Sequence, residues 1–159
     1  MSFATADLYD EHGGDLQVVH PMFRHYGAVR KFHGPVVTLK VHEDNTLVRA
    51  ALEEPGDGRV LVIDGGGSLR CALVGDMLAE LGIKNGWAGI IVYGCIRDSA
   101  VIGQMDIGIK ALNTNPKKSV KKGVGDRDIL IRFGEVAFET GDHVYADEDG
   151  IVVSRTALL

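Results

Sequence analysis

Two compact apolar segments on either side of a helical pattern constrain the fold of this chain more than any other feature. Residues 59–64 and 88–93 are short apolar runs, typical of strands covered on both faces of a sheet. Between them, residues 75–83 place apolar side chains such as Met77 and Leu78 at helical spacing, which predicts a helix with these side chains on its buried face. This order predicts a βαβ unit whose strands are parallel neighbours with a right-handed crossover.

The rest of the chain is predicted to form shorter elements around this unit. Segment 35–41 is rich in β-branched residues and is typical of a strand, and segment 47–52 has the spacing of a helix capped by Asp44 or Asn45. Further elements are expected at 5–11 (helix) and at 106–109, 129–133, 136–138 and 150–153 (strands). No repeat or linker interrupts the sequence, so we expect one compact α/β or α+β domain over residues 1–159.

Composition and charge narrow the classes of function. Seventeen Lys and Arg residues against 22 Asp and Glu residues give a net charge of −5, which argues against direct binding of nucleic acid. No apolar run approaches the roughly 18 residues of a membrane span, and the N-terminus lacks the pattern of a signal peptide. Cys71 and Cys95 have no metal-binding or redox spacing, which fits a reducing compartment. We therefore expect a cytoplasmic protein with no membrane partner.

The βαβ unit predicts where a site lies. In open α/β sheets, ligands bind outside the carboxyl ends of the strands. Three features fall there: Asp64 with Gly65–Gly67 after the first strand, Gly75–Leu78 at the start of the helix, and Arg97 with Asp98 after the second strand. We expect these features to converge at one edge of the sheet.

Each of these groups has a chemical use. Free N–H groups at a helix start bind a carboxylate, and the Arg97 guanidinium matches the oxygens of a keto acid. Asp76 and Asp98 offer the hard oxygen ligands that Mg²⁺ and Mn²⁺ prefer. A metal held there would polarise a 2-keto group and stabilise an enolate. From these residues alone, an ordinary surface pair of Arg97 and Asp98 is the alternative.

Gly75-Asp76, then twenty residues, then Arg97-Asp98 resembles the signature of the RraA-like family. That family contains 4-hydroxy-4-methyl-2-oxoglutarate aldolases with oxaloacetate decarboxylase activity, and it contains the regulator of ribonuclease activity A. The resemblance covers nearly the whole chain. Further blocks that resemble the family in the same order are Val62–Gly67, Ile91–Gly94, Phe133–Gly134 and Gly141–Ile151.

The resemblance implies a fold, an assembly and a reaction. It implies a compact domain with a swivelling β/β/α arrangement, assembled as a ring-shaped homotrimer with sites at subunit contacts. It implies a metal-dependent lyase that cleaves 4-hydroxy-4-methyl-2-oxoglutarate to pyruvate by retro-aldol chemistry and also decarboxylates oxaloacetate. The chain ends at Leu159 without the C-terminal extension of longer aldolases, so we expect a reduced aldolase rate.

The resemblance also assigns roles to residues. Asp98 would bind the Mg²⁺ or Mn²⁺ ion directly, and the catalytic residues would be Asp76, acting through a water molecule on the metal, and Arg97. The small 2-keto acid substrate would be bound by the side chain of Arg97 and by the backbone of Gly75, Asp76, Met77 and Leu78.

Two other functions stay open. One is a non-catalytic regulator that binds and inhibits an endoribonuclease. The other is a methyltransferase, because the segment Val60–Gly67 superficially resembles a nucleoside-binding glycine loop, although Ser68 stands where that loop needs a glycine. The lysines of the 117–122 segment are expected to form an ordinary solvated loop.

Overall fold

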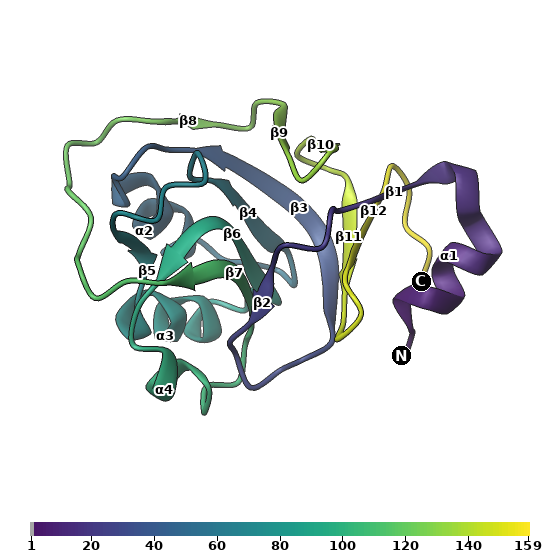
Figure 1. Cartoon of the computed structure of the whole chain (residues 1–159), viewed down its shortest axis with the longest axis horizontal. Coiled ribbons are helices and arrows are strands. Elements are labelled where there is room, and N and C mark those ends of the chain that lie inside the picture. The colour runs from purple at the N-terminus through teal and green to yellow at the C-terminus, as the bar shows by residue number, and fades with distance from the viewer. Residues whose placement is uncertain (1) are drawn as a thin grey trace.

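The computed structural model describes residues 2–159, and ten strands within this range form one mixed sheet (Figure 1). Its centre consists of four parallel strands in the order β3, β4, β6 and β7. Because parallel strands end at the same edge, the segments that follow these strands all leave the sheet on one side. The bounds of the four strands are Phe32–Lys40, Val60–Asp64, Gly89–Ile96 and Gly108–Thr114.

Antiparallel strands extend the parallel centre on both sides. Beyond β3 lie β11, β12 and β1 in turn, and beyond β7 lies β2. The short strands β5 and β8 pair with β6 and β3, and β9 and β10 form a separate hairpin. These strands are β1 (Leu16–Val18), β2 (Arg24–His25), β5 (Ala72–Val74), β8 (Asp126–Arg127), β9 (Ile131–Phe133), β10 (Val136–Phe138), β11 (His143–Ala146) and β12 (Ile151–Ser154).

Helices and the β9–β10 hairpin cover opposite faces of the parallel centre. Leu61 and Ile63 of β4 pack in one apolar core with side chains of α2 (Thr46–Leu52) and α3 (Asp76–Lys84). Val60 and Val62 pack in a second core with Phe133 and Phe138 of the hairpin. All five residues of β4 are buried, as expected for a strand covered on both faces.

Helix α1 (Thr5–His12) stands apart from these layers, beyond β12 at the right of Figure 1. Leu8 of this helix and Phe3, which precedes it, pack against Tyr145 of β11 and Val152 of β12. The remaining helices are α4 (Ser99–Ile102) and the short 3₁₀ turn η1 (Gly13–Asp15). Within residues 2–159, no helix has both the length and the apolar character needed to cross a membrane.

The predicted βαβ unit is confirmed as β4, α3 and β6, with β4 and β6 paired in parallel. Strand β6 does not stop at Tyr93, because its pairing with β5 and β7 continues past Gly94 to Ile96. Strand β7 occupies residues 108–114 rather than 106–109. The expected burial of Leu78 is confirmed, whereas that of Met77 is wrong: its side chain is 69% exposed, and Ala79 is the further side chain that α3 buries.

Candidate functional site

An open cavity of about 210 Å³ lies at the carboxyl edge of the parallel strands. Elements far apart in the sequence bound it: the start of α2, strand β5, the start of α3, the turn after β6, and the segment 117–124 between β7 and β8. We call this last segment the lysine loop. The cavity is lined by Asn45, Thr46, Arg49, Ala72, Gly75, Asp76, Met77, Leu78, Arg97, Asp98, Lys118, Ser119 and Lys121.

Gly75-Asp76 and Arg97-Asp98 meet in this cavity, as their positions after β5 and β6 require. The Arg97 N–H donates to the Val74 carbonyl at 2.9 Å, which continues the pairing of the two strands. The Asp76 N–H, at the start of α3, donates to Oδ2 of Asp98 at 3.0 Å. The predicted convergence of these two pairs is confirmed.

Asp98 holds an unusual backbone conformation, with φ at +60° and ψ at +37°. The left-handed region is uncommon for residues other than glycine, although Asp and Asn adopt it more readily than most. This conformation turns the chain sharply between β6 and α4, and it places the carboxylate at the start of α3. The helix dipole and the free N–H groups of the first turn stabilise a negative charge there.

Gly75 leaves no room for a side chain beside Asp98. A Cβ atom at this position would lie 2.8 Å from Oδ2 of Asp98 and 3.5 Å from Nε of Arg97. The Gly75→Ala variant is therefore expected to displace the Asp98 carboxylate and to lower the activity of this site by about tenfold or more, because small misplacements of reacting groups are costly. The measurement is steady-state kinetics beside a thermal melt. Gly14→Ala, where a Cβ meets nothing within 4 Å, is the control, and equal kinetics in both variants would contradict this expectation.

The Arg97 guanidinium is free to bind a ligand. Its only hydrogen bond within the described chain goes from Nη1 to the Pro116 carbonyl, at a long 3.4 Å. No carboxylate from residues 2–159 forms an ion pair with it. A guanidinium in this state can direct two parallel N–H groups at a carboxylate or at the oxygens of a 2-keto acid.

Asp76 and Asp98 both line the cavity, and carboxylate oxygens are the ligands that Mg²⁺ and Mn²⁺ prefer. Among residues 2–159, no group of three or more His, Cys, Asp or Glu side chains could enclose a metal ion. Mg²⁺ does not need such a cage, because it keeps several water ligands and commonly takes only one or two carboxylates. One oxygen of Asp98 accepts the Asp76 N–H, and the other is left for a metal.

Ala72 of β5 and six other lining residues were missed by the sequence reasoning, and these six fall into two groups. Three come from the start of α2 and three from the lysine loop, which was expected to be a solvated loop. The position of the lysine loop could have been found from the length of β7. This strand is parallel to β6 and continues to Thr114, so the chain that follows it begins at the same edge of the sheet as α3. These residues are Asn45, Thr46, Arg49, Lys118, Ser119 and Lys121.

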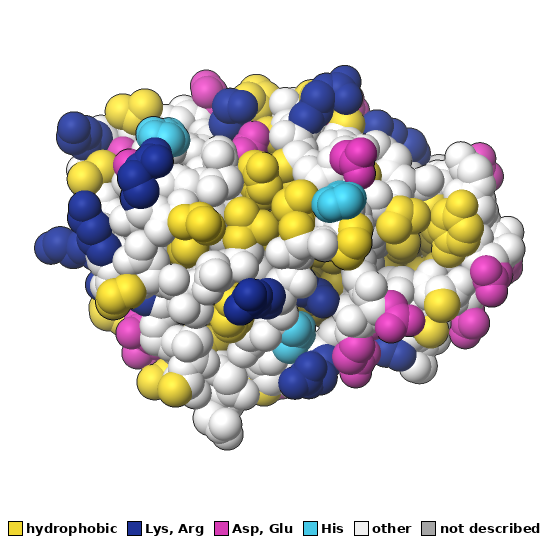
Figure 2. Space-filling model, viewed as in Figure 1, with side chains coloured by type: hydrophobic (Ala, Val, Ile, Leu, Met, Phe, Trp, Pro, Cys, Tyr) yellow, Lys and Arg dark blue, Asp and Glu magenta, His cyan; other side chains and the backbone are white. Residues whose placement is uncertain are grey.

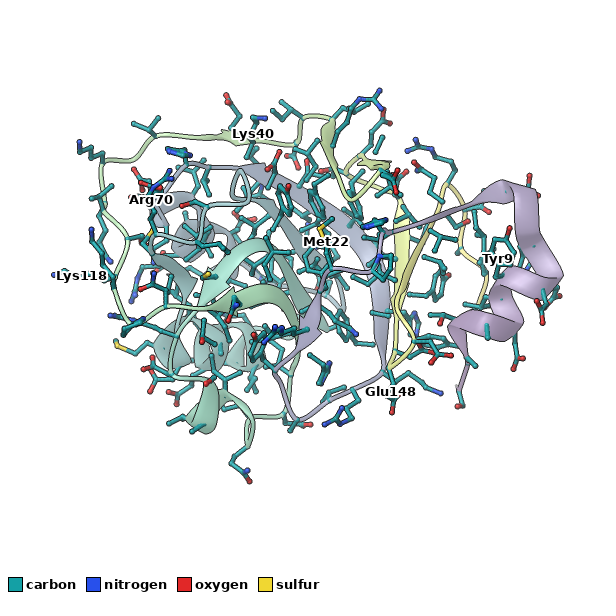
Figure 3. All side chains as sticks on the ribbon, in the orientation of Figure 1. Tyr9, Met22, Lys40, Arg70, Lys118 and Glu148 are labelled. Carbon is teal, nitrogen blue, oxygen red and sulfur yellow. The ribbon has the colours of Figure 1, made fainter. Side chains whose placement is uncertain are left out.

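The cavity is positively charged in a protein whose net charge is −5. Four cationic side chains line it against the two carboxylates, and Figure 2 shows Lys and Arg side chains gathered along the left edge, where Figure 1 places the lysine loop. Lys118 projects from that loop in Figure 3. The Oγ atom of Ser119 is buried and has no hydrogen-bond partner among residues 2–159. This lining suits a small ligand that carries more than one negative charge.

Asp64 and its glycines lie at the same carboxyl edge of the sheet, as predicted, but they do not line this cavity. The N–H groups of Gly65 and Gly67 donate to the Tyr93 carbonyl, and the Gly66 N–H donates to Oδ1 of Asp64. The N–H groups of the turn are therefore already bonded, to β6 and within the turn itself. Oδ2 of Asp64 lies 3.4 Å from Nζ of Lys40, in a separate surface hollow.

Cys95 lies two residues before Arg97 but takes no part in the cavity lining. Its side chain is buried, and burial raises the pKa of the thiol. The thiol therefore stays protonated near neutral pH, which removes it as a candidate nucleophile.

Known proteins resemble the chain over its full length. The model of the RraA-like family, described as Aldolase/RraA, matches residues 5–153. Relatives from Alkalilimnicola ehrlichii and Aromatoleum aromaticum are 59% and 61% identical over 159 residues, covering 100% of this chain and 99% and 100% of theirs. Both carry the name "Putative 4-hydroxy-4-methyl-2-oxoglutarate aldolase".

Solved structures give a similar result. A Geobacillus kaustophilus protein, described as an S-adenosylmethionine: 2-dimethylmenaquinone methyltransferase, superposes with a TM-score of 0.97 at 52% identity, covering 98% of this chain and 97% of its own. The RNA-processing inhibitor RraA from Thermus thermophilis superposes with a TM-score of 0.96 at 41% identity, covering 100% of this chain and 96% of its own. The shared fold is thus associated with three different described functions.

Proposed function

The chain belongs to the RraA-like family, and we propose that it is a divalent-metal-dependent lyase that cleaves 4-hydroxy-4-methyl-2-oxoglutarate to pyruvate and decarboxylates oxaloacetate. One observation carries the proposal. The start of α3, the free Arg97 guanidinium and the Asp76–Asp98 pair face one cationic cavity. This combination supplies an anion site, a fork for keto-acid oxygens and hard ligands for a metal in one small volume.

The keto-acid end of the substrate binds between α3 and Arg97. The first-turn N–H groups of α3, at Met77 and Leu78, have no partners within the helix and point along its dipole toward the cavity. These N–H groups donate hydrogen bonds to the substrate carboxylate, while Arg97 donates to its oxygens from the side of β6. The 2-keto group is thereby directed at the two carboxylates.

The far end of the substrate meets the cations of α2 and the lysine loop. Arg49, Lys118 and Lys121 line that side of the cavity, and Nζ of Lys121 has only a 3.4 Å contact with the Asn45 side chain. A second carboxylate, present in both proposed substrates, neutralises this charge.

The reaction divides into bond cleavage and protonation. A bound Mg²⁺ or Mn²⁺ would be held directly by Asp98 and would supply Lewis-acid stabilisation of the developing enolate. Asp76 accepts the proton of the distal hydroxyl through a water molecule as the carbon–carbon bond breaks. The electron pair of that bond forms the pyruvate enolate, and the distal fragment leaves with a new carbonyl group as a second pyruvate. Arg97 holds that enolate until the same water returns a proton to carbon. Decarboxylation of oxaloacetate needs the enolate-forming and protonation steps but no hydroxyl base.

We also propose the ring-shaped homotrimer and the cytoplasmic location that the family resemblance implies. Apolar side chains are exposed on two elements that bound the cavity, Met77 on α3 and Val120 in the lysine loop, and Val101 is exposed on α4, which directly follows Asp98. Exposed apolar side chains next to a site favour a subunit contact there. Light scattering of the purified protein tests the trimer.

A regulator of RNA processing is the second candidate, and the Thermus structure favours it. It needs no bound metal and no intact Arg97-Asp98 pair. A pull-down with an endoribonuclease, followed by an assay of its activity, separates this function from the lyase.

The description of the Geobacillus structure favours a methyltransferase. The glycine turn after β4 does not support it here, because its three N–H groups are already bonded within the turn and to Tyr93. A thermal shift produced by S-adenosylmethionine would revive this function.

Pyruvate release tests the proposed lyase. With Mg²⁺ or Mn²⁺, we expect release from oxaloacetate and from 4-hydroxy-4-methyl-2-oxoglutarate, and we expect EDTA to abolish it because the enolate loses its Lewis acid. Assays with metal but without protein measure the spontaneous rate. Release no faster than that background would refute the lyase and leave the regulator as the leading function.

A further inference from the structure

The lysine loop reaches the cavity on a long exposed path, and its position depends on a few contacts. Most of its residues are exposed, and Figure 1 shows it running along the left edge of the molecule between β7 and β8. It nevertheless brings Lys118, Ser119 and Lys121 to the cavity rim. Some feature of the fold must hold these residues in place.

The first half of the loop is held by backbone pairing. The Ala72 N–H of β5 donates to the Lys117 carbonyl at 2.8 Å. The Val120 N–H donates to the Glu43 carbonyl at 3.0 Å, and the Asn45 N–H donates to the Val120 carbonyl at 3.3 Å. These bonds leave residues 121–124 without a strand partner.

The second half is held by one buried carboxylate, that of Asp44, which is 2% exposed. Its Oδ2 accepts the N–H groups of Lys122 at 2.9 Å and Val124 at 3.2 Å. Its Oδ1 accepts the N–H and the hydroxyl of Thr46 at 2.9 and 2.8 Å. The Thr46 hydroxyl oxygen in turn accepts the Gly123 N–H at 3.1 Å, so three consecutive loop amides are fixed.

The Asp44 carboxylate remains charged in this buried place. Burial by itself would raise its pKa, but the hydrogen bonds from Thr46, Val124 and Lys122 outweigh burial and lower the pKa to about 2. The folded-state value lies below that of the unfolded chain, so the stabilisation is complete above about pH 4 and is lost as the pH falls through about 2. The carboxylate therefore binds the loop amides as an anion throughout the neutral range.

We propose that Asp44 is a positioning residue: its carboxylate fixes the lysine loop against the start of α2, and the fixed loop sets how tightly the cavity binds the distal carboxylate of the substrate. Asp44 does not line the cavity and touches no reacting group. It acts through Lys121 and Ser119, which stand between its anchor at Lys122 and the paired Lys117. The effect on substrate affinity rests on the proposed lyase function, whereas the effect on the loop does not.

The kinetic test uses Asp44→Asn, which keeps the size of the side chain but replaces one acceptor oxygen with a donor facing the loop amides. We expect KM for 4-hydroxy-4-methyl-2-oxoglutarate to rise about tenfold, the scale of one lost charge-assisted hydrogen bond, with kcat changed less than about twofold. Inhibition by oxalate probes the half of the cavity built by α3 and Arg97. Its inhibition constant should stay unchanged.

A second readout needs no catalysis. The loop carries Lys117, Lys118, Lys121 and Lys122, so trypsin cleavage there, located by mass spectrometry, reports how firmly the loop is held. We expect Asp44→Asn to increase the rate of this cleavage about tenfold. The hydrogen bond between Thr46 and the loop is tested in the same way. Thr46→Val should increase the rate of cleavage, and Thr46→Ser should keep the wild-type rate because it keeps the hydroxyl.

Asp147→Asn is the matched control. Asp147 is also a buried carboxylate, and it accepts the N–H and hydroxyl of Thr5 and the N–H of Asp149. It precedes Glu148, which Figure 3 places at the lower right, away from Lys118 at the left. This variant should lower the melting temperature without changing KM or tryptic cleavage of the loop.

Two results would overturn the positioning role. One is wild-type KM and wild-type loop cleavage in Asp44→Asn. The other is a parallel loss of kcat, oxalate binding and melting temperature, which would indicate general destabilisation. Should Asp44→Asn fail to fold, tryptic cleavage of Thr46→Val and Thr46→Ser tests the same anchor; KM is not used for these variants because Thr46 itself lines the cavity. A wild-type protein that releases no pyruvate would contradict the lyase, while tryptic cleavage still decides whether Asp44 holds the loop.

Discussion

Arg97→Ala is expected to lower kcat/KM for both proposed substrates by about a thousandfold, since two charge-assisted hydrogen bonds to a carboxylate or enolate contribute this much. The loss should appear in kcat as well as KM, because the guanidinium holds the enolate as well as the substrate. Folding should be little affected. The side chain makes one long hydrogen bond and no ion pair within residues 2–159, so the stability change is expected to be within about 0.5 kcal/mol.

Steady-state kinetics and thermal melts of three variants test this expectation. Arg97→Lys keeps the charge but loses the planar fork, and it should recover only part of the lost activity. Arg132→Ala removes an exposed arginine of β9 that does not line the cavity, and it should behave as wild type. Wild-type kinetics in Arg97→Ala would remove Arg97 from the site.

The centre of the fold could be predicted from sequence because its pattern is strong and local. The strands β4 and β6 are continuous apolar runs, and a run of this kind is stable only between two covering layers. The helix α3 follows from apolar residues at helical spacing. The meeting of Asp76 with Asp98 then follows from the βαβ topology, since Asp76 begins the helix and Asp98 follows the second strand, and both positions lie at the carboxyl edge of the sheet.

What the sequence could not predict depends on contacts between distant segments. The three residues of β5 become a strand only because β6 is beside them. Met77 has the spacing of a buried residue, but the first turn of α3 lies at the cavity rim, where nothing covers it. The spacing of apolar residues along a helix does not show which of its turns are covered by other elements of the fold.

The lysine loop shows the same limit at the site. Four lysines within six residues are typical of a solvated segment, and they are exposed here too. Their place at the cavity depends on a carboxylate more than seventy positions earlier, Asp44, and on the full length of β7. The left-handed conformation of Asp98 is likewise set by the turn between β6 and α4, since aspartate at most positions has a negative φ.

Asp98→Ala is expected to abolish metal-dependent pyruvate release, with a loss of about a thousandfold or more in kcat/KM, because removing the direct ligand removes the Lewis acid from the enolate. Asp98 also accepts the Asp76 N–H at the start of α3, so this variant should lose about 1 kcal/mol of stability as well. Asp98→Asn separates the two effects. Its amide oxygen can still accept the Asp76 N–H, which preserves stability, but its neutral side chain is a poor ligand for Mg²⁺.

Calorimetric titration with Mn²⁺ and pyruvate release at increasing Mg²⁺ distinguish these roles. Both Asp98 variants should bind Mn²⁺ more weakly than the wild type, and Asp98→Asn should need far more Mg²⁺ to recover any activity. Asp106→Asn, an exposed aspartate that does not line the cavity, is the control and should titrate as wild type. Full activity in Asp98→Ala would refute the metal assignment, and with it the enolate chemistry that depends on a metal at this site. Lost activity with unchanged Mn²⁺ binding would place the metal elsewhere and leave Asp98 a role at the start of α3.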